Sequence, residues 1–149
     1  MSINFMYRLS CFGAFAATFC LTVACAAAPI AVPQNLVVAR LVPRAMPTAP
    51  YARPDDPPRI VRIWFSTLTL RPGIWFDGVI VGSTNLASVE VRTAAFSINS
   101  AHVGPGIYRF HMRVLELPPL SRRHDYQLSI IGRNTAGVQT VEQAPLRIE

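Results

Sequence analysis

Three histidines are the first residues in this chain that could do chemistry: His102, His111 and His124. A zinc site needs three or four ligands that converge, and zinc-binding sequences usually show paired ligands a few residues apart. No two of these histidines have such a spacing. We therefore expect no metal site and no cofactor, and we interpret the histidines as solvated side chains.

Hydrolytic catalysis has no recognisable arrangement of residues either. The chain lacks a G-x-S-x-G nucleophile motif, and its one pair of adjacent carboxylates is Asp55 and Asp56, in a proline-rich stretch where a rigid, water-excluding site is not expected. Acids elsewhere in the chain, among them Asp77, Glu90, Glu116 and Asp125, are isolated in sequence. We predict no catalytic residue and expect that the chain is not an enzyme.

Two groups of side chains could bind a ligand without transforming it. Arg109, His111 and Arg113 alternate along one segment and would share one face of a strand, where they could hold an anion or form an ordinary solvated face. Trp64 lies opposite its apolar neighbours in the alternation and is expected to point away from the core. With Trp75 it could form an aromatic platform for sugar rings, or it could pack beneath the preceding segment.

The amino-terminal segment has the organisation of an export signal. No charged residue occurs from Leu9 to Ala39, and the residues up to Arg8 form a short basic n-region. The uncharged run 9–23 has the length of a signal h-region, and small residues at 24–26 favour cleavage after Ala26. Residues 1–26 are therefore predicted to be a signal peptide, which places the rest of the chain outside the cytoplasm.

The cysteines leave three outcomes open for this segment. Cys11, Cys20 and Cys25 all lie within it, so a chain cleaved after Ala26 would carry no disulfide. The run 22–25 resembles a bacterial lipobox, which would make Cys25 a lipidation site. Without cleavage, residues 9–28 are just long enough to remain as a membrane anchor. The protein would accordingly be periplasmic, cell-surface or secreted, and would contact the membrane only through this segment.

Residues 27–58 are predicted to form a proline-rich, disordered linker. Eight prolines fall within these 32 positions, and proline removes backbone donors and disfavours both helix and central strand. We expect an extended spacer that holds the following domain away from a surface or a partner. Residues 35–39 are its one apolar cluster and could dock on the domain.

Residues 59–149 are predicted to form a single all-β domain. Short runs rich in valine, isoleucine and aromatic residues alternate with turn residues, which is typical of a sandwich or barrel. The expected strands are 59–66, 74–81, 88–93, 95–98, 107–114, 126–131, and 138–141 continued by 146–148. About seven strands in a domain of this size is the count of an immunoglobulin-like antiparallel β-sandwich.

The run from Tyr126 to Gly137, with Leu120 six residues before the tyrosine, resembles the last hairpin of a fibronectin type III or related bacterial immunoglobulin-like domain. The resemblance implies that Leu120 and Tyr126 form a tyrosine corner, and that Asn134 and Gly137 shape the turn between the last two strands. Residues 79–91 are similar to the second and third strands of such modules. The usual proline and threonine near the tyrosine are replaced by Arg122 and His124.

Charge and location narrow the expected partners. The chain has 14 basic residues, all of them arginine, against 8 acidic ones. Outside the cytoplasm a nucleic-acid partner is not expected, so the partner would be another envelope protein or a surface polymer. We predict a non-catalytic immunoglobulin-like interaction or structural module of the cell envelope. The alternative is a carbohydrate- or anion-binding domain that uses Trp64, Arg109, His111 and Arg113. The sequence leaves the oligomeric state open.

Overall fold

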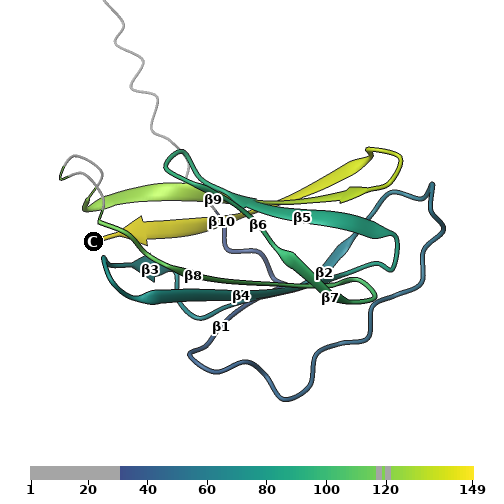
Figure 1. Cartoon of the computed structure of the whole chain (residues 1–149), viewed down its shortest axis with the longest axis horizontal. Coiled ribbons are helices and arrows are strands. Elements are labelled where there is room, and N and C mark those ends of the chain that lie inside the picture. Colours follow the sequence, from purple (N-terminus) through teal and green to yellow (C-terminus); the bar gives the residue numbers. More distant parts are fainter. Residues whose placement is uncertain (1–30, 117–118, 120–121) are drawn as a thin grey trace, which may run out of the picture.

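Two five-stranded β-sheets face each other in the computed structural model, which describes residues 31–116, 119 and 122–149 (Figure 1). The strands are β1 (Leu36–Val38), β2 (Ile60–Phe65), β3 (Thr69–Leu70), β4 (Trp75–Gly82), β5 (Leu86–Arg92), β6 (Ser97–Asn99), β7 (Ala101–Gly104), β8 (Ile107–Arg113), β9 (His124–Asn134) and β10 (Gln139–Ile148). Sheet 1 has the order β1-β2-β4-β8-β7, and sheet 2 has the order β3-β10-β9-β5-β6.

The predicted all-β sandwich is confirmed. Each of the seven expected segments falls on a strand, and the structure adds the short strands β1, β3 and β7. The two segments expected at the carboxyl end are one continuous strand, β10. Pro145 is tolerated in its middle because β3 pairs with β10 only at Arg147 and Ile148, so the proline has a neighbouring strand on one side alone.

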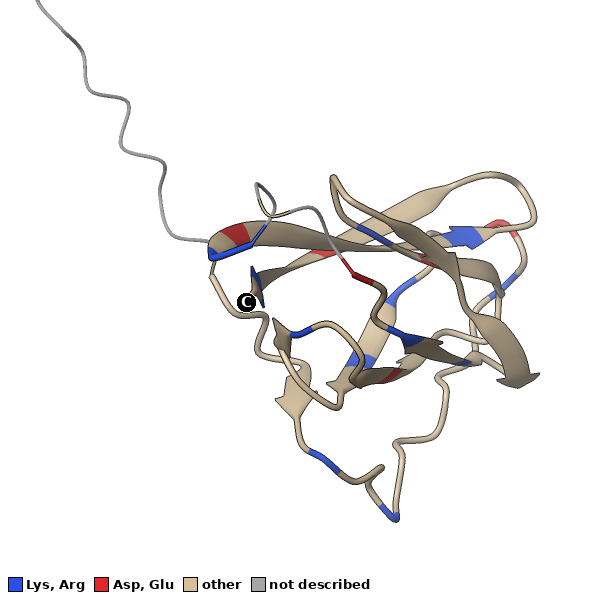
Figure 2. Ribbon diagram, turned by 60° about the vertical axis from the view of Figure 1, so that its left-hand side comes forward, with Lys and Arg blue, Asp and Glu red and all other residues tan. Residues whose placement is uncertain are grey.

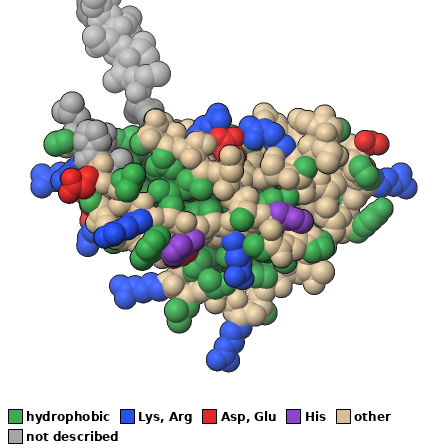
Figure 3. All heavy atoms as spheres, viewed as in Figure 1, with side chains coloured by type: hydrophobic (Ala, Val, Ile, Leu, Met, Phe, Trp, Pro, Cys, Tyr) green, Lys and Arg blue, Asp and Glu red, His purple; other side chains and the backbone are tan. Residues whose placement is uncertain are grey.

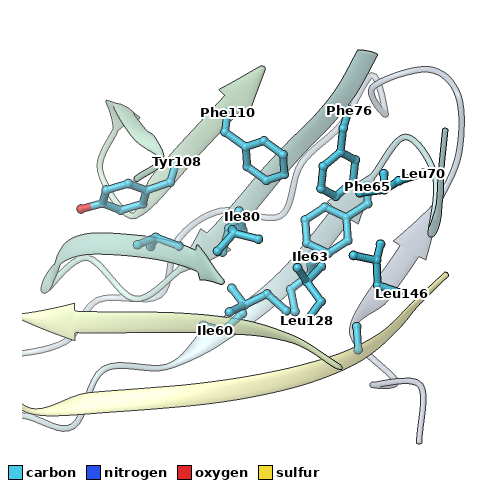
Figure 4. Packing of buried hydrophobic residues seen from close by; sticks show 14 of the residues in the cluster. Ile60, Ile63, Phe65, Leu70, Phe76, Ile80, Tyr108, Phe110, Leu128 and Leu146 are labelled. Atoms are coloured by element: carbon cyan, nitrogen blue, oxygen red, sulfur yellow. The ribbon is translucent and has the colours of Figure 1, made fainter. Parts of the chain in front are cut away.

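Strand alternation supplies the core between the sheets. On β4 the buried side chains of Phe76 and Ile80 point inward, and on β8 Tyr108 and Phe110 do the same. From the opposite sheet, β9 and β10 contribute apolar side chains such as Leu128 and Leu146 (Figure 4). Apolar burial of this kind can hold the described part of the chain together without a disulfide.

A cluster of three phenylalanines depends on a glycine. The ring of Phe110 lies 5.8 Å from that of Phe65 and 5.0 Å from that of Phe76, centroid to centroid. Gly78 lies opposite Phe110 across the β4–β8 ladder, and a Cβ atom there would be only 2.1 Å from the ring of Phe110. Because Gly78 has no side chain, the ring of Phe110 can occupy the space beside its Cα atom.

The proline-rich segment differs from the prediction of a disordered linker. Its residues 36–38 form β1, which runs parallel to β2 and adds a fifth strand to sheet 1. The apolar cluster 35–39 therefore docks on the domain, and Asn35 Nδ2 donates a hydrogen bond to the carbonyl of Ile60 at 3.2 Å. The segment between β1 and β2 then loops out beside sheet 1 and carries arginines and two acids of its own, whereas the other charged residues are spread over the sandwich (Figure 2).

The end of this segment is also attached to the sandwich. The backbone N–H of Thr84 donates to the carbonyl of Pro50 at 2.9 Å, and Ala52, which is buried, donates its N–H to the hydroxyl of Thr84 at 3.0 Å. Asn85 Nδ2 donates to the carbonyls of Arg53 and Asp56. Hydrogen bonds between residues 25 to 80 positions apart in sequence thus hold the proline-rich segment, in which proline lacks the N–H needed for strand pairing.

The turn between β9 and β10 is built on Asn134 and Gly137. Asn134 Oδ1 accepts a hydrogen bond from the N–H of Val138 at 2.9 Å, and Gly137 has φ of +82°, a conformation that glycine adopts without strain. Asn134 Nδ2 also donates to the carbonyls of Pro54 and Asp56, both at 3.1 Å. One side chain therefore shapes the hairpin and anchors the proline-rich segment.

Several predicted features lie outside the described residues. They include the signal segment 1–26 with Cys25, and Leu120, the expected partner of Tyr126. Tyr126 itself is half-buried near the start of β9 and packs against the core. The buried hydroxyl of a different tyrosine, Tyr108, donates a hydrogen bond to the carbonyl of Leu86 at 2.7 Å. No helix in the described part of the chain is long and apolar enough to span a membrane.

Candidate functional site

The outer face of sheet 1, on the side away from the core, brings the functional side chains together. Trp75 pairs with Arg113, Asp77 with His111 and Val79 with Arg109 across the antiparallel β4–β8 ladder. Paired residues point to the same side of a sheet, and every second residue shares that side. Figure 3 shows histidine and arginine side chains near one another over this region.

The indole of Trp75 is the most exposed aromatic surface on this face, with 54% of its area accessible. Its ring stacks on that of His111, with centroids 4.1 Å apart and planes inclined by 12°. His111 Nδ1 in turn donates a hydrogen bond to the carboxylate of Asp77. The imidazole is therefore fixed from one side by Asp77 and supports Trp75 on the other, so a flat apolar surface is held open to solvent.

Two hollows meet at Asp77. The first has a volume of about 540 Å³, and its lining includes Arg40, Thr67, Arg71, Trp75, Asp77 and Glu149. The second has a volume of about 340 Å³, and its lining includes Val42, Trp64, Asp77, Arg109 and His111. Both are within the size range of sites for small ligands. The Trp75–His111 stack forms the ridge between them.

The polar groups of the larger hollow are partly paired. Arg71 Nε donates to Glu149 Oε2 at 2.7 Å, which holds a guanidinium and a carboxylate side by side. None of the described residues forms an ion pair or hydrogen bond with the guanidiniums of Arg40 or Arg109. The face therefore offers free donors, a carboxylate acceptor and an exposed ring, which together can bind a polyhydroxylated or anionic ligand.

The predicted ligand residues Arg109, His111 and Arg113 do lie on this one face, whereas Trp64 is not an exposed platform and packs beneath the proline-rich segment, the other arrangement that its position allows. Trp64 points away from the core as the alternation indicates, but it is only 1% exposed. Val37 of β1 pairs with it, and Pro43 and Pro47 lie over the same side. The proline-rich segment folds back over sheet 1, so Trp75 supplies the accessible ring instead.

The histidines do not converge. His111 belongs to the stack just described, the ring of His102 lies 5.0 Å from that of Tyr108, and His124 begins β9 on the opposite sheet. Among the described residues no group of three or more histidine, cysteine or acidic side chains could hold a metal ion.

A buried acid on the outer face of sheet 2 was not predicted. Glu90 is 7% exposed and accepts hydrogen bonds from the hydroxyl of Ser97 at 2.6 Å, from Arg92 at 2.8 Å and from Arg133 at 3.1 Å. The hydroxyl of Ser97 and the two guanidiniums lower the pKa of Glu90 against the opposing effect of burial. Arg133 lies 43 residues away on the neighbouring strand, so the sequence carries no local signal of this cluster.

Comparison with known proteins does not assign a family. No family model and no curated protein matches the chain. The X-ray structure of an endo-beta-1,4-mannanase from Thermotoga petrophila is similar over 64% of this chain and 20% of that one, with 12% sequence identity and a TM-score of 0.43. This neighbour is itself an enzyme, and the prediction that the chain is not an enzyme was based on missing motifs alone. That prediction is therefore withdrawn. A likeness of this degree assigns neither an activity nor a substrate.

Proposed function

We propose that this protein is an extracytoplasmic binding module that recognises a carbohydrate through the outer face of sheet 1. The observation that carries the proposal is the exposed indole of Trp75, held flat by its stack on His111. The C–H face of a sugar ring is apolar and packs on the electron-rich face of an indole. A ring that is already oriented loses little side-chain entropy when a ligand binds.

The groups around Trp75 suit the hydroxyls of a sugar. The Asp77 carboxylate can accept hydrogen bonds while it holds His111, and the paired Arg71 and Glu149 present donors and an acceptor in one hollow. Arg40 and Thr67 line the same hollow. A few polar groups at the edge of an apolar surface are the usual composition of a site that orients a small ligand.

The strand order supports an immunoglobulin-like type of sandwich. In that fold the strands A, B, E and D form one sheet, and C, F and G form the other. Here sheet 1 contains β2, β4, β8 and β7 in the spatial order that corresponds to A, B, E and D. Sheet 2 contains β5, β9 and β10 in the order that corresponds to C, F and G. The short β3 follows β2 along the chain but lies in sheet 2, where it pairs parallel with β10. The strand that corresponds to A is therefore divided between the two sheets, as β2 and β3.

Export supports the choice of ligand. The signal segment expected at residues 1–26 would bring the module to the cell envelope or beyond, by release, by lipidation at Cys25 or by an uncut anchor. Polysaccharides are abundant ligands in those places, and the arginine-rich face is suited to those that carry negative charge.

The test is binding of the full-length chain to a panel of neutral and acidic oligosaccharides, with replacement of Trp75 by alanine. Removing about 50 to 100 Å² of apolar contact costs roughly 1.3 to 2.5 kcal/mol at 25 cal/mol/Å². Affinity should therefore fall about tenfold or more. Tyr51, which is 80% exposed and outside both hollows, is the matched control, and Tyr51→Ala should bind normally. Equal binding by Trp75→Ala and the native chain would refute the proposal.

A second function, contact with an envelope protein through a strand edge, is favoured by residues 97–104. β6 is the edge of sheet 2 and β7 is the edge of sheet 1, and one residue, Ser100, separates them. Open edges accept an added strand, and Val103 is 54% exposed there. A photo-crosslinker at position 103 should give a discrete adduct in the host envelope, whereas one at the exposed Val138 should not. Identical patterns at both positions would exclude edge docking.

A further inference from the structure

A separate hollow lies beneath the proline-rich segment on the outer face of sheet 1. We call residues 40–49, which follow β1, the arm. The hollow has a volume of about 260 Å³, and its lining includes Pro43, Met46 and Pro47 from the arm, Val37 from β1, and Arg62 and Trp64 from β2. The side chains that line it are therefore apolar except for the guanidinium of Arg62 and the indole of Trp64.

The indole N–H of Trp64 is a buried donor without an acceptor. Trp64 is only 1% exposed, and its Nε1 atom meets no hydrogen-bond partner among the described residues. Nearly all buried polar groups in proteins are hydrogen-bonded, because an unpaired buried donor loses its hydration and gains nothing in return. A donor left in this state beside a hollow is the kind of group that a ligand satisfies.

Arg62 supplies a cation on the same side of β2. It precedes Trp64 by two positions in one strand, so the two side chains share a face. Arg62 is exposed, and none of the described residues pairs with its guanidinium. A guanidinium forms strong, charge-assisted hydrogen bonds with carboxylates. The hollow thus combines one neutral donor, one cationic donor and apolar walls.

From these observations we propose that the hollow under the arm binds a small apolar carboxylate. The carboxylate pairs with Arg62, and a small outward shift of the arm lets it accept a hydrogen bond from Trp64 Nε1, which is buried in the structure. Its apolar part packs among Pro43, Met46 and Pro47. The volume equals the liquid volume of about nine water molecules, which suits an acid the size of hexanoate or benzoate. Trp75 takes no part, so the inference does not depend on the proposed carbohydrate site.

The test is titration of the ¹⁵N-labelled full-length chain with hexanoate and with benzoate, observed at the two indole N–H resonances. The chain has two tryptophans, and a Trp75→Phe variant assigns them. The Trp64 resonance should move downfield and saturate as its N–H gains an acceptor, while that of Trp75 stays unchanged. Hexanoate and benzoate separate an acyl-chain ligand from an aromatic one. Hexanol, which lacks the charge, and acetate, which lacks the apolar part, should bind at least about tenfold more weakly.

Three variants make the result decisive. Arg62→Gln should weaken hexanoate binding at least about tenfold, because it removes the charge-assisted hydrogen bond. Arg44→Gln removes a charge from the arm at a position outside the lining and should bind as the native chain does. Trp64→Phe keeps a ring in place and deletes the donor, so its affinity should also fall. An unmoved Trp64 resonance, or equal affinities of Arg62→Gln and Arg44→Gln, would overturn the proposal.

Discussion

The contact between Gly78 and Phe110 makes a quantitative prediction about the core. In Gly78→Ala the new Cβ atom would lie 2.1 Å from Phe110 Cε1, 2.4 Å from Phe110 Cζ and 2.9 Å from Phe65 Cδ1. Ordinary carbon contacts are about 3.5 to 4.0 Å. The ring of Phe110 would therefore have to retreat by roughly 1.4 to 1.9 Å.

The ring has little room for such a movement. Phe110 is 7% exposed and packs on Phe65 and Phe76, whose ring centroids lie within 5.8 Å of its own. Overpacking a core in this way costs about 1 to 3 kcal/mol, occasionally more, and the severity of this overlap favours the upper end. A loss of about 3 kcal/mol corresponds to a fall in melting temperature of roughly 10 °C for a domain of this size.

Thermal and urea denaturation of the full-length chain measure this cost. Gly104→Ala is the matched control, because its Cβ would meet only Ile107 Cδ1 at an ordinary 3.9 Å. Its stability should change by no more than about 0.5 kcal/mol. A Phe110→Leu background removes the two closest ring atoms and leaves only the 2.9 Å approach to Phe65 Cδ1, so Gly78→Ala should there cost clearly less than in the native chain. A melting temperature of Gly78→Ala within about 2 °C of the native value, or the same cost in both backgrounds, would contradict the reasoning.

Three further predictions concern other contacts. The pKa of Glu90 is lowered in the folded state, chiefly by the Ser97 hydroxyl, so its carboxylate stabilises the fold above its unfolded pKa of about 4.3 and that contribution disappears as pH falls through the lower folded pKa. Glu90→Gln should therefore be less stable than the native chain at pH 7, and the urea midpoints of the two chains should converge as the pH falls through the lowered pKa of Glu90. A chain that starts at residue 59 should unfold at lower urea than one that starts at residue 31 and show red-shifted Trp64 fluorescence, whereas equal midpoints would indicate a dispensable linker. Tyr108→Phe should lose about 1 to 2 kcal/mol, because it leaves a buried carbonyl unpaired; an unchanged midpoint would argue against that bond.

Local patterns in the sequence were sufficient to predict seven of the ten strands of the described residues, all but the short β1, β3 and β7. The alternation over 107–114 placed Arg109, His111 and Arg113 on one face, and it placed Trp64 on the outer side of β2, because neighbouring side chains of a strand point to opposite sides whatever lies beyond them. Asn134 and Gly137 were expected at the last turn because the run that contains them resembles the last hairpin of a fibronectin type III domain, and their backbone preferences suit that place. These inferences need no knowledge of distant residues.

The accessibility of the site was decided by the tertiary structure. The prolines of residues 27–58 disfavour regular structure, but whether that segment extends into solvent or folds back on the sandwich depends on Thr84, Asn85 and Asn134, which lie far along the chain. For that reason Trp64 is covered and Trp75 is exposed, although both are tryptophans in strands of the same sheet.

What the sequence alone determined is the side of the sheet on which each strand residue lies, because that follows from the two-residue period of a strand. Which of those residues remain accessible was settled only when β1, the arm and the β4–β8 ladder came together in space. His111 on β8 lies more than 30 residues after Trp75 and Asp77 on β4. It stacks on Trp75 and binds Asp77 only because of the register in which β4 and β8 pair. Register depends on pairing energies summed over both sheets, which no short pattern of residues contains.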